Sequence, residues 1–549
     1  MKHDASSLSR RQFVELGSLA AAAAALPGLG RGRPEPAPPV ALPPDQEHFA
    51  LAETTVADLQ SAMRSGQLTA RSITQAYLDR IRATNLESPT LRAVLETNPD
   101  ALDIADQLDA ERKQGKVRGP MHGIPVIVKD NIGTHDKMLT CAGSLALLGN
   151  YALQDAGLVE RLRAAGAVIL AKANLSEWAN FRSTRSSSGW SGRGRQCRNP
   201  YVLDRNPSGS SSGSAASASA NLCAVAVGSE TDGSITSPSN ACGLVGLKPT
   251  VGLVSRAGVI PISHSQDTAG PMCRSVADVA ALLSAMAGVD PRDEATAAAQ
   301  GHIEPDYTKF LDPNGLRGMR IGVRPRDGRI PEVNELFEQA IKVVRDHGAE
   351  VVDPADIETW GKLGDAERTV LQYEFKHDLN AYLATMPEGV KYRTLADIIA
   401  YNDAHADTEM PYFGQETFIA CQKRGPLTDR EYLDARAKCV DLTRAKGIDA
   451  TMDKYKLDAM MGPSGGPAGI VDLVTLTGGG GGGGSSQFPA VSGYPHITVP
   501  AGHSFGLPMG ISFYGRAWSE ATLLKIAYAF EQATKARREP QFIPTLVLS

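Results

Sequence analysis

Short apolar runs alternate along this chain with segments whose apolar residues recur at helical spacing. Residues 55–84 predict two helices separated by Gly66, and residues 156–165 predict another that ends at Gly166. β-Branched or apolar runs typical of buried strands occupy residues 124–128, 168–171, 223–227, 320–323 and 497–499. This alternation favours an α/β layered domain, and residues 327–457 are expected to be mostly helical.

The composition and net charge argue against several classes of protein. Of the 549 residues, 42% are hydrophobic and 21% charged, which is ordinary globular usage. The formal net charge of -5 argues against a nucleic-acid partner bound through counterion release. Seven cysteines without a CxxC pair predict neither a disulfide framework nor a zinc ribbon. The absence of an apolar run of about 18 residues predicts no membrane span.

The N-terminus has the features of an export signal. Ser9, Arg10 and Arg11 precede a short apolar stretch that Pro27 and Gly28 end. Paired arginines before such a stretch are typical of the twin-arginine pathway. We therefore expect a signal peptide over residues 1–31, a Pro-rich spacer over 32–50 and one large domain over 51–549.

Export by the twin-arginine pathway would determine where the mature protein is located and whether its cysteines are reduced. The mature protein is expected in the periplasm, without stable membrane association after export by the twin-arginine machinery. Cargo of this pathway folds before export, so all seven cysteines are expected to be reduced and buried. The alternative for the N-terminus is an amphipathic helix with two surface arginines.

Two segments have low complexity. Residues 208–219 are almost entirely Ser, Gly and Ala, and residues 478–484 are seven consecutive glycines. The glycine run is expected to be a linker or a mobile loop at the rim of a cleft. The Ser/Gly/Ala tract is expected to carry chemistry instead, because of the motifs around it.

The sequence lacks the usual motifs of metal and phosphate chemistry. It contains neither HExxH nor GxxxxGK[ST], so no metal or cofactor is expected. Residues 209–213 fit GxSxG, which would make Ser211 the nucleophile of an α/β-hydrolase with a histidine base. That motif requires a strand directly before the serine, whereas residues 204–208 are typical of a turn.

Residues 207–250 and 122–131 together resemble the amidase signature family. A Gly/Ser loop, an apolar segment, a Gly-Ser-Ile turn and CGLVGLKPT follow in order, within a signature region of residues 123–276. The resemblance extends through residues 493–500 and 506–510 and covers residues 52–540. It implies an α/β fold in one domain, with a large mixed β-sheet covered by helices on both faces.

The same resemblance implies site residues. Lys129 matches the family's catalytic lysine, Ser234 the acylated nucleophile, and Ser210 the serine that bridges them, which follows a cis peptide bond. Thr231, Asp232, Gly233 and Ser234 match the turn that forms the oxyanion hole.

The chemistry of these residue types supports the assignment. A lysine can act as a base only when neutral, and burial lowers its pKa. Lys129 follows the apolar residues 126–128, so a desolvated position is expected. Asp130 could instead pair with Lys129 and keep it charged, which would disable the base.

The resemblance implies an exported amidase that forms a Ser acyl-enzyme and releases ammonia or an amine. The turn from Glu230 to Ser234 and the segment from Tyr494 to Glu531 are similar to a peptide amidase branch, which acts on peptide C-terminal amides. Short aliphatic or aryl amides are the alternative substrates. A tRNA-dependent amidotransferase that works with tRNA-charging partners and a non-catalytic binding homologue are the alternative functions. Substrate-pocket residues are expected within 140–200, 370–460 and 463–486.

Overall fold

A computed structural model describes residues 49–326, 330–476 and 484–546, all of which belong to one compact unit. The predicted signal peptide, all but the end of the predicted spacer and most of the glycine run lie outside the described residues. Within the described part of the chain, no helix is long and apolar enough to cross a membrane.

The centre of the fold is an eleven-stranded mixed sheet in the order β1-β3-β2-β6-β8-β7-β12-β13-β11-β9-β10. A separate two-stranded sheet joins β4 and β5. The strands are β1 (Val94–Thr97), β2 (Pro125–Lys129), β3 (Val168–Ala173), β4 (Trp190–Ser191), β5 (Arg195–Gln196), β6 (Val225–Glu230), β7 (Val245–Lys248), β8 (Thr268–Cys273), β9 (Arg320–Val323), β10 (Glu350–Val352), β11 (Ala459–Pro463), β12 (His496–Ser504) and β13 (Leu507–Tyr514).

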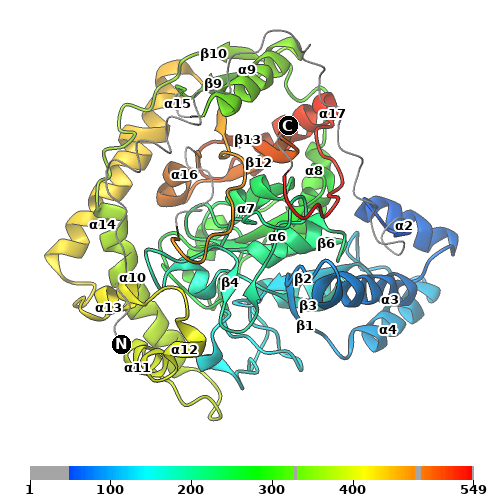
Figure 1. The fold of residues 1–549 in the computed structure, drawn as a ribbon. Helices are drawn as coiled ribbons and strands as arrows, with labels where there is room; N and C mark the ends of the chain where they lie inside the picture. Colours follow the sequence, from blue (N-terminus) through cyan, green and yellow to red (C-terminus); the bar gives the residue numbers. More distant parts are fainter. Residues whose placement is uncertain (1–48, 327–329, 477–483, 547–549) are drawn as a thin grey trace, which may run out of the picture. The chain divides into compact units, whose positions relative to one another are not determined.

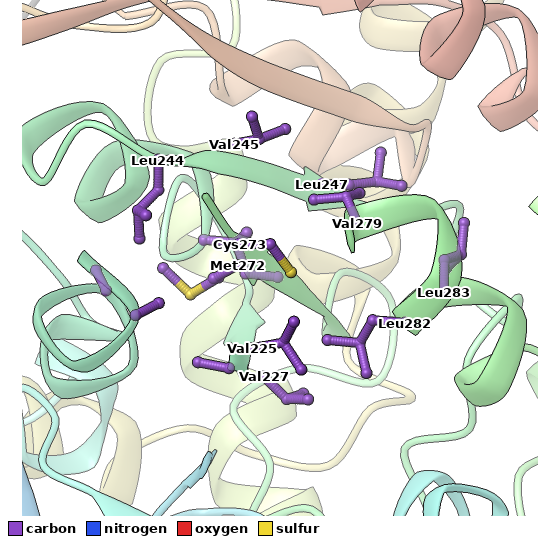
Figure 2. Packing of buried hydrophobic residues seen from close by; sticks show 14 of the residues in the cluster. Val225, Val227, Leu244, Val245, Leu247, Met272, Cys273, Val279, Leu282 and Leu283 are labelled. Atoms are coloured by element: carbon purple, nitrogen blue, oxygen red, sulfur yellow. The ribbon is translucent and has the colours of Figure 1, made fainter. Parts of the chain in front are cut away.

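Helices cover both faces of this sheet. On β7, a Cβ added at Gly246 would meet Ser239 of α7, whereas Leu247 lies beside Val279 of α8 (Figure 2). Because successive strand residues point to opposite faces, α7 and α8 lie on opposite sides of the sheet. The buried core around α8 includes Val225 and Cys273 from the neighbouring strands β6 and β8 (Figure 2).

The helices surround the sheet, and those from α10 to α15 form an arc along one side (Figure 1). Their bounds are α2 (Val56–Ser65), α3 (Ala70–Ile81), α4 (Ala101–Lys113), α5 (Gly157–Ala164), α6 (Ser212–Ser219), α7 (Thr236–Ala241), α8 (Val276–Met286), α9 (Pro331–Asp346), α10 (Ala366–Ala384), α11 (Leu395–Ala404), α12 (Ala406–Glu409), α13 (Glu416–Gln422), α14 (Arg430–Thr443), α15 (Asp449–Tyr455), α16 (Gln487–Ser492) and α17 (Glu520–Thr534).

The predicted alternation of helices and strands is confirmed. The break at Gly66 separates α2 from α3, and Gly66 adopts a left-handed φ of 78° at the C-cap. Each of the five apolar runs forms a strand of the large sheet, although β6 begins at Val225 rather than at Cys223. The large mixed sheet with helices on both faces is the predicted fold class.

The Ser/Gly/Ala tract is structured. Its last eight residues form α6, and every residue of this helix is buried. A Cβ at Gly213 would lie 2.3 Å from the carbonyl oxygens of Ala93 and Asn174. The small side chains thus let a helix pack closely against backbone, which a linker does not require.

All seven cysteines are buried, and none forms a disulfide. This agrees with the expectation that they are small buried apolar residues.

Candidate active site

Strand β2 places Lys129 at its carboxyl end, where it lies fully buried next to β6. Its Nζ is 2.8 Å from Ser210 Oγ, 2.9 Å from Ser229 Oγ and 3.1 Å from the carbonyl oxygen of Ser229. The predicted lysine and the predicted bridging serine are therefore in direct contact.

Burial lowers the pKa of Lys129 to about 7, although the negative charges of Asp267 and Glu230 oppose this effect. Asp130 does not pair with the lysine. Its carboxylate accepts a hydrogen bond of 2.8 Å from Arg193 and one of 2.9 Å from the N–H of Gly143. The alternative in which Asp130 keeps Lys129 charged is thus not what the structure shows.

Ser210 lies in the loop directly before α6. The Gly209–Ser210 peptide bond is cis, as the resemblance implies. The carbonyl oxygen of Ser210 accepts a hydrogen bond from the N–H of Ser176 at 3.0 Å. This loop therefore holds the Ser210 hydroxyl against Lys129.

Ser234 lies in the turn between β6 and α7. Glu230 closes this turn, because its Oε2 accepts the N–H groups of Ile235 at 2.7 Å and Thr236 at 3.0 Å. The N–H of Ser211 donates to the carbonyl oxygen of Ser234 at 3.2 Å. The turn is thus bonded to the residue that follows Ser210, and the predicted site residues lie together.

The backbone of the turn offers free donors. Gly233 has a φ of +75°, which a residue with a Cβ rarely adopts. Among the described residues, the N–H groups of Asp232, Gly233 and Ser234 donate to no acceptor, and the Ser234 hydroxyl makes no hydrogen bond. Unpaired donors around a serine suit the stabilisation of an oxyanion.

Four further residues complete the site. Asn131 Nδ2 donates to Ser229 Oγ at 2.9 Å, and Thr231 Oγ1 donates to Asp267 at 2.5 Å. Burial raises the pKa of Asp267 to about 6. The sequence motifs predict no role for Asn131, Ser229, Glu230 or Asp267. Three of these are adjacent or nearly adjacent to predicted site residues, whereas the contact of Asp267 depends on the pairing of β6 with β8.

A cavity of about 190 Å³ adjoins this cluster, and Asn131, Ser229 and Thr231 form part of its wall. Its apolar lining comes largely from a run of four residues, Val259, Ile260, Pro261 and Ile262. The ranges predicted to line a substrate pocket contribute only Ala179 and Asp378. Most of this wall comes instead from residues 256–268, and the predicted ranges for the substrate pocket stay a prediction.

At the edge of the same cavity, His264 lies between two carboxylates. Its Nδ1 is 2.8 Å from Asp378 and its Nε2 is 3.4 Å from the buried Glu374. Burial alone would lower the pKa of His264, but the hydrogen bond to Asp378 and the charge of Glu374 outweigh burial and raise it. The ligand atoms of these three residues lie within 4.8 Å of one another, close enough for a metal ion, but both ring nitrogens already face a carboxylate.

Ser211 does not occupy a nucleophile elbow. The residues immediately before it do not form a strand, and its hydroxyl is bonded to the backbone of Ser229 as a donor at 3.0 Å and as an acceptor at 3.2 Å. These two hydrogen bonds hold the carboxyl end of β6, whose Ser229 contacts Lys129. The α/β-hydrolase alternative therefore has no support in the described residues.

Comparison with known proteins identifies the family. The family model described as Amidase matches residues 72–524. A probable amidase of Arabidopsis thaliana is 45% identical over 504 residues, which are 90% of this chain and 93% of that protein. The native peptide amidase from Stenotrophomonas maltophilia superimposes with a TM-score of 0.86 at 51% identity, covering 90% of this chain and 100% of that one.

A more distant relative belongs to another functional class. A glutamyl-tRNA(Gln) amidotransferase chain of Thermoanaerobacter pseudethanolicus is 34% identical, over 90% of this chain and 99% of that protein. The match of the Amidase model to most of the chain, with relatives well above 30% identity, establishes the family. The chain belongs to the amidase signature family and is an amide-hydrolysing enzyme.

Proposed function

We propose that this enzyme is an exported amidase that acylates Ser234 and uses Ser210 and Lys129 to move the proton, with peptide C-terminal amides as substrates. The contact between Ser210 and a fully buried Lys129 is the observation that carries this proposal. A lysine with a pKa of about 7 is partly neutral at neutral pH, as a general base must be.

The hydrogen bonds around Lys129 suit its neutral form. A neutral amine has two N–H groups and one lone pair, and the Nζ has three partners at 2.8–3.1 Å. The carbonyl oxygen of Ser229 can only accept, and Ser229 Oγ can accept the second N–H. The lone pair then faces the hydroxyl of Ser210, which is the direction in which a proton must move.

The reaction follows from this arrangement. Ser234 Oγ attacks the amide carbonyl while its proton passes to Ser210, whose own proton passes to Lys129. The free N–H groups of the turn stabilise the resulting oxyanion, and each such donor typically lowers the barrier by about 2.7–4 kcal/mol. Return of the proton to the nitrogen expels ammonia, and water then releases the acid by the same relay.

Similarity and the cavity support the peptide substrate class. Among the solved structures of high similarity is a peptide amidase in complex with the competitive inhibitor chymostatin, at 51% identity and a TM-score of 0.86. The apolar wall at residues 259–262 offers contact to a side chain next to the scissile amide. A short aliphatic amide would leave much of this wall uncovered.

Ammonia release across a panel of amides tests this function. The purified enzyme is given N-blocked dipeptide amides, short aliphatic amides and aryl amides at pH 8. We expect the highest kcat/KM for the peptide amides, and no turnover for Ser234→Ala. Preference for short amides would favour the second candidate substrate class, and turnover only with a tRNA-charging partner would favour a tRNA-dependent amidotransferase.

We also propose that residues 1–31 direct export through the twin-arginine pathway. Arg10 and Arg11 before a short apolar stretch support this proposal. Fractionation of cells that express the full chain is expected to place the enzyme in the periplasm, and R10K/R11K is expected to leave it in the cytoplasm. Equal periplasmic amounts of both proteins would contradict the proposal.

A further inference from the structure

A second cavity, of about 420 Å³, lies next to the cavity at the catalytic cluster, and His264 forms part of the wall of both. The rest of its wall includes the chain after β7, part of α14, the end of α16 and the segment before α17. Lys129, Ser210 and Ser234 do not line it. The proposed reaction therefore gives this second cavity no role.

Two arginines line the second cavity. Arg436 lies on α14, and Arg444 directly follows this helix, which belongs to the helical arc (Figure 1). Both are partly buried, and none of the described residues in the wall carries a carboxylate. Arg436 forms no hydrogen bond or ion pair with any described residue. Arginines that are withdrawn from water usually have a partner, so the wall lacks an anion.

Arg444 is held so that two of its nitrogens stay available. Its Nε donates to the carbonyl oxygen of Ser492 at 2.7 Å, and its guanidinium carbon lies 5.6 Å from the centre of the Tyr494 ring. Gly493 leaves room for Nη2, which lies 3.5 Å from the position that a Cβ there would occupy. Neither Nη1 nor Nη2 donates to an acceptor among the described residues. Two such nitrogens match the two oxygens of a carboxylate.

The two positive charges act on each other. Burial lowers the pKa of Arg444, and the charge of Arg436 lowers it further, whereas Tyr494 and Asp449 oppose this effect. Asp449 does not line the cavity, and its Oδ2 accepts a hydrogen bond from the Tyr494 hydroxyl at 2.9 Å. A bound anion would relieve the repulsion between the two guanidinium groups.

The carboxylates at the shared wall already have partners. Asp378 accepts from His264 Nδ1 at 2.8 Å. Glu374 accepts from the Ser265 hydroxyl at 2.8 Å and from the Tyr432 hydroxyl at 2.8 Å. These groups therefore stay with His264 and its neighbours, and they leave Arg436 and Arg444 without a carboxylate.

We propose that the second cavity binds an organic carboxylate, with Arg444 and Arg436 as its cationic partners. Arg444 takes both oxygens through Nη1 and Nη2, and Arg436 adds a second positive charge. The rings of Tyr494 and Trp518 lie in the same wall, and Trp518 is stacked on His302 with ring centres 4.8 Å apart. These rings offer contact to the organic part of the ligand, which an inorganic anion lacks.

Two sources can supply such a carboxylate. One is an acidic side chain of a peptide amide whose scissile bond lies in the neighbouring catalytic cavity, since His264 borders both cavities. This source rests on the proposed function. The other is a free dicarboxylate, whose binding requires no substrate and no turnover.

Isothermal titration calorimetry at pH 8 distinguishes the two sources. The probes are glutarate and N-acetyl tripeptide amides with one Glu, or a matching Gln, at the first or second position. The protein carries Ser234→Ala, so the peptides are not consumed. An acidic side chain as the ligand predicts that a Glu peptide binds at least about tenfold more tightly than its Gln match. A free carboxylate as the ligand predicts glutarate binding without discrimination between the peptides.

Arg436→Gln, added to the same protein, removes one cationic partner. Whichever probe binds is expected to lose at least about tenfold in affinity. Arg436 has no hydrogen-bond partner among the described residues, so this variant is expected to keep the parent's Tm. Arg430→Gln is the matched control, because Arg430 is an exposed arginine of the same helix paired with Asp434. It is expected to leave binding unchanged.

The inference is overturned if glutarate does not bind and the Glu and Gln peptides bind equally. Equal losses in Arg436→Gln and Arg430→Gln would overturn it as well. A protein that binds glutarate through Arg436, but whose parent hydrolyses no amide, would refute the proposed function and leave the carboxylate site standing. Hydrolysis of peptide amides without any binding that depends on Arg436 would refute the carboxylate site alone.

Discussion

Lys129 is the residue on which the proposed chemistry depends most closely. Burial lowers its pKa to about 7, so the neutral amine becomes the major form as the pH rises above that value. We predict that kcat/KM for a peptide amide increases with pH between about 6 and 8 and reaches its maximum above pH 8. The base is lost as the pH falls, because the ammonium form has no lone pair for the proton of Ser210.

Lys129→Arg provides the control, because a guanidinium keeps the positive charge and does not lose its proton. Its kcat/KM at pH 8 is expected to fall by at least about 10²-fold, as when a general base is removed. A variant with near wild-type turnover, or a wild-type profile that is flat from pH 5 to 8, would show that Lys129 is not the base.

Among the elements, the arginine of a buried ion pair joins the loop after β3 to the segment between α12 and α13 of the helical arc. Arg182 is 2.8 Å from Glu177, and neither side chain is exposed. The guanidinium also lies 4.4 Å from the centre of the Phe413 ring and donates to the carbonyl oxygens of Phe413 and Gly414. Arg182→Met leaves Glu177 buried without its cation, which typically destabilises a protein by about 3–5 kcal/mol.

Urea unfolding of wild type and variants measures this effect. Arg430→Met is the comparison, because Arg430 and Asp434 form an exposed pair on α14, and such pairs contribute less than about 1 kcal/mol. We expect the free energy of unfolding to fall clearly for the first variant and hardly at all for the second. Equal effects would mean that the loop is not held by its buried ion pair.

Part of the fold and part of the candidate site can be predicted from the sequence. The apolar runs predict the strands, because burial on both faces of a sheet requires such composition. Lys129, Ser210 and Ser234 could be assigned because they lie in motifs of local sequence. The hydrogen bond from Gln266 to Glu367 could not be predicted, since it joins a loop to a helix 101 positions later in the numbering, and periodicity carries no information on such contacts.

Throughout the molecule, the cysteines share the same kind of environment. All seven are free and buried, and burial raises the pKa of Cys223, for example, to about 12. Buried thiols with raised pKa values react slowly with disulfide reagents. We predict no rapid reaction of the native enzyme with a thiol reagent, and seven reactive thiols after denaturation without reductant.

Prior reduction provides the control for this titration. It is expected to leave the count at seven, because no disulfide is present to be opened. A lower count before reduction than after it would show a disulfide in the purified protein. It would also contradict the expectation that the chain folds with its thiols reduced.

In the proposed mechanism, Ser234 carries the acyl group. Rapid acid quenching of the enzyme during turnover of a peptide amide, followed by proteolysis and mass spectrometry, detects this acyl-enzyme. We predict an acyl adduct on the peptide that contains Ser234, with no adduct and no turnover in Ser234→Ala. An adduct on Ser211, or wild-type turnover by Ser234→Ala, would contradict the mechanism.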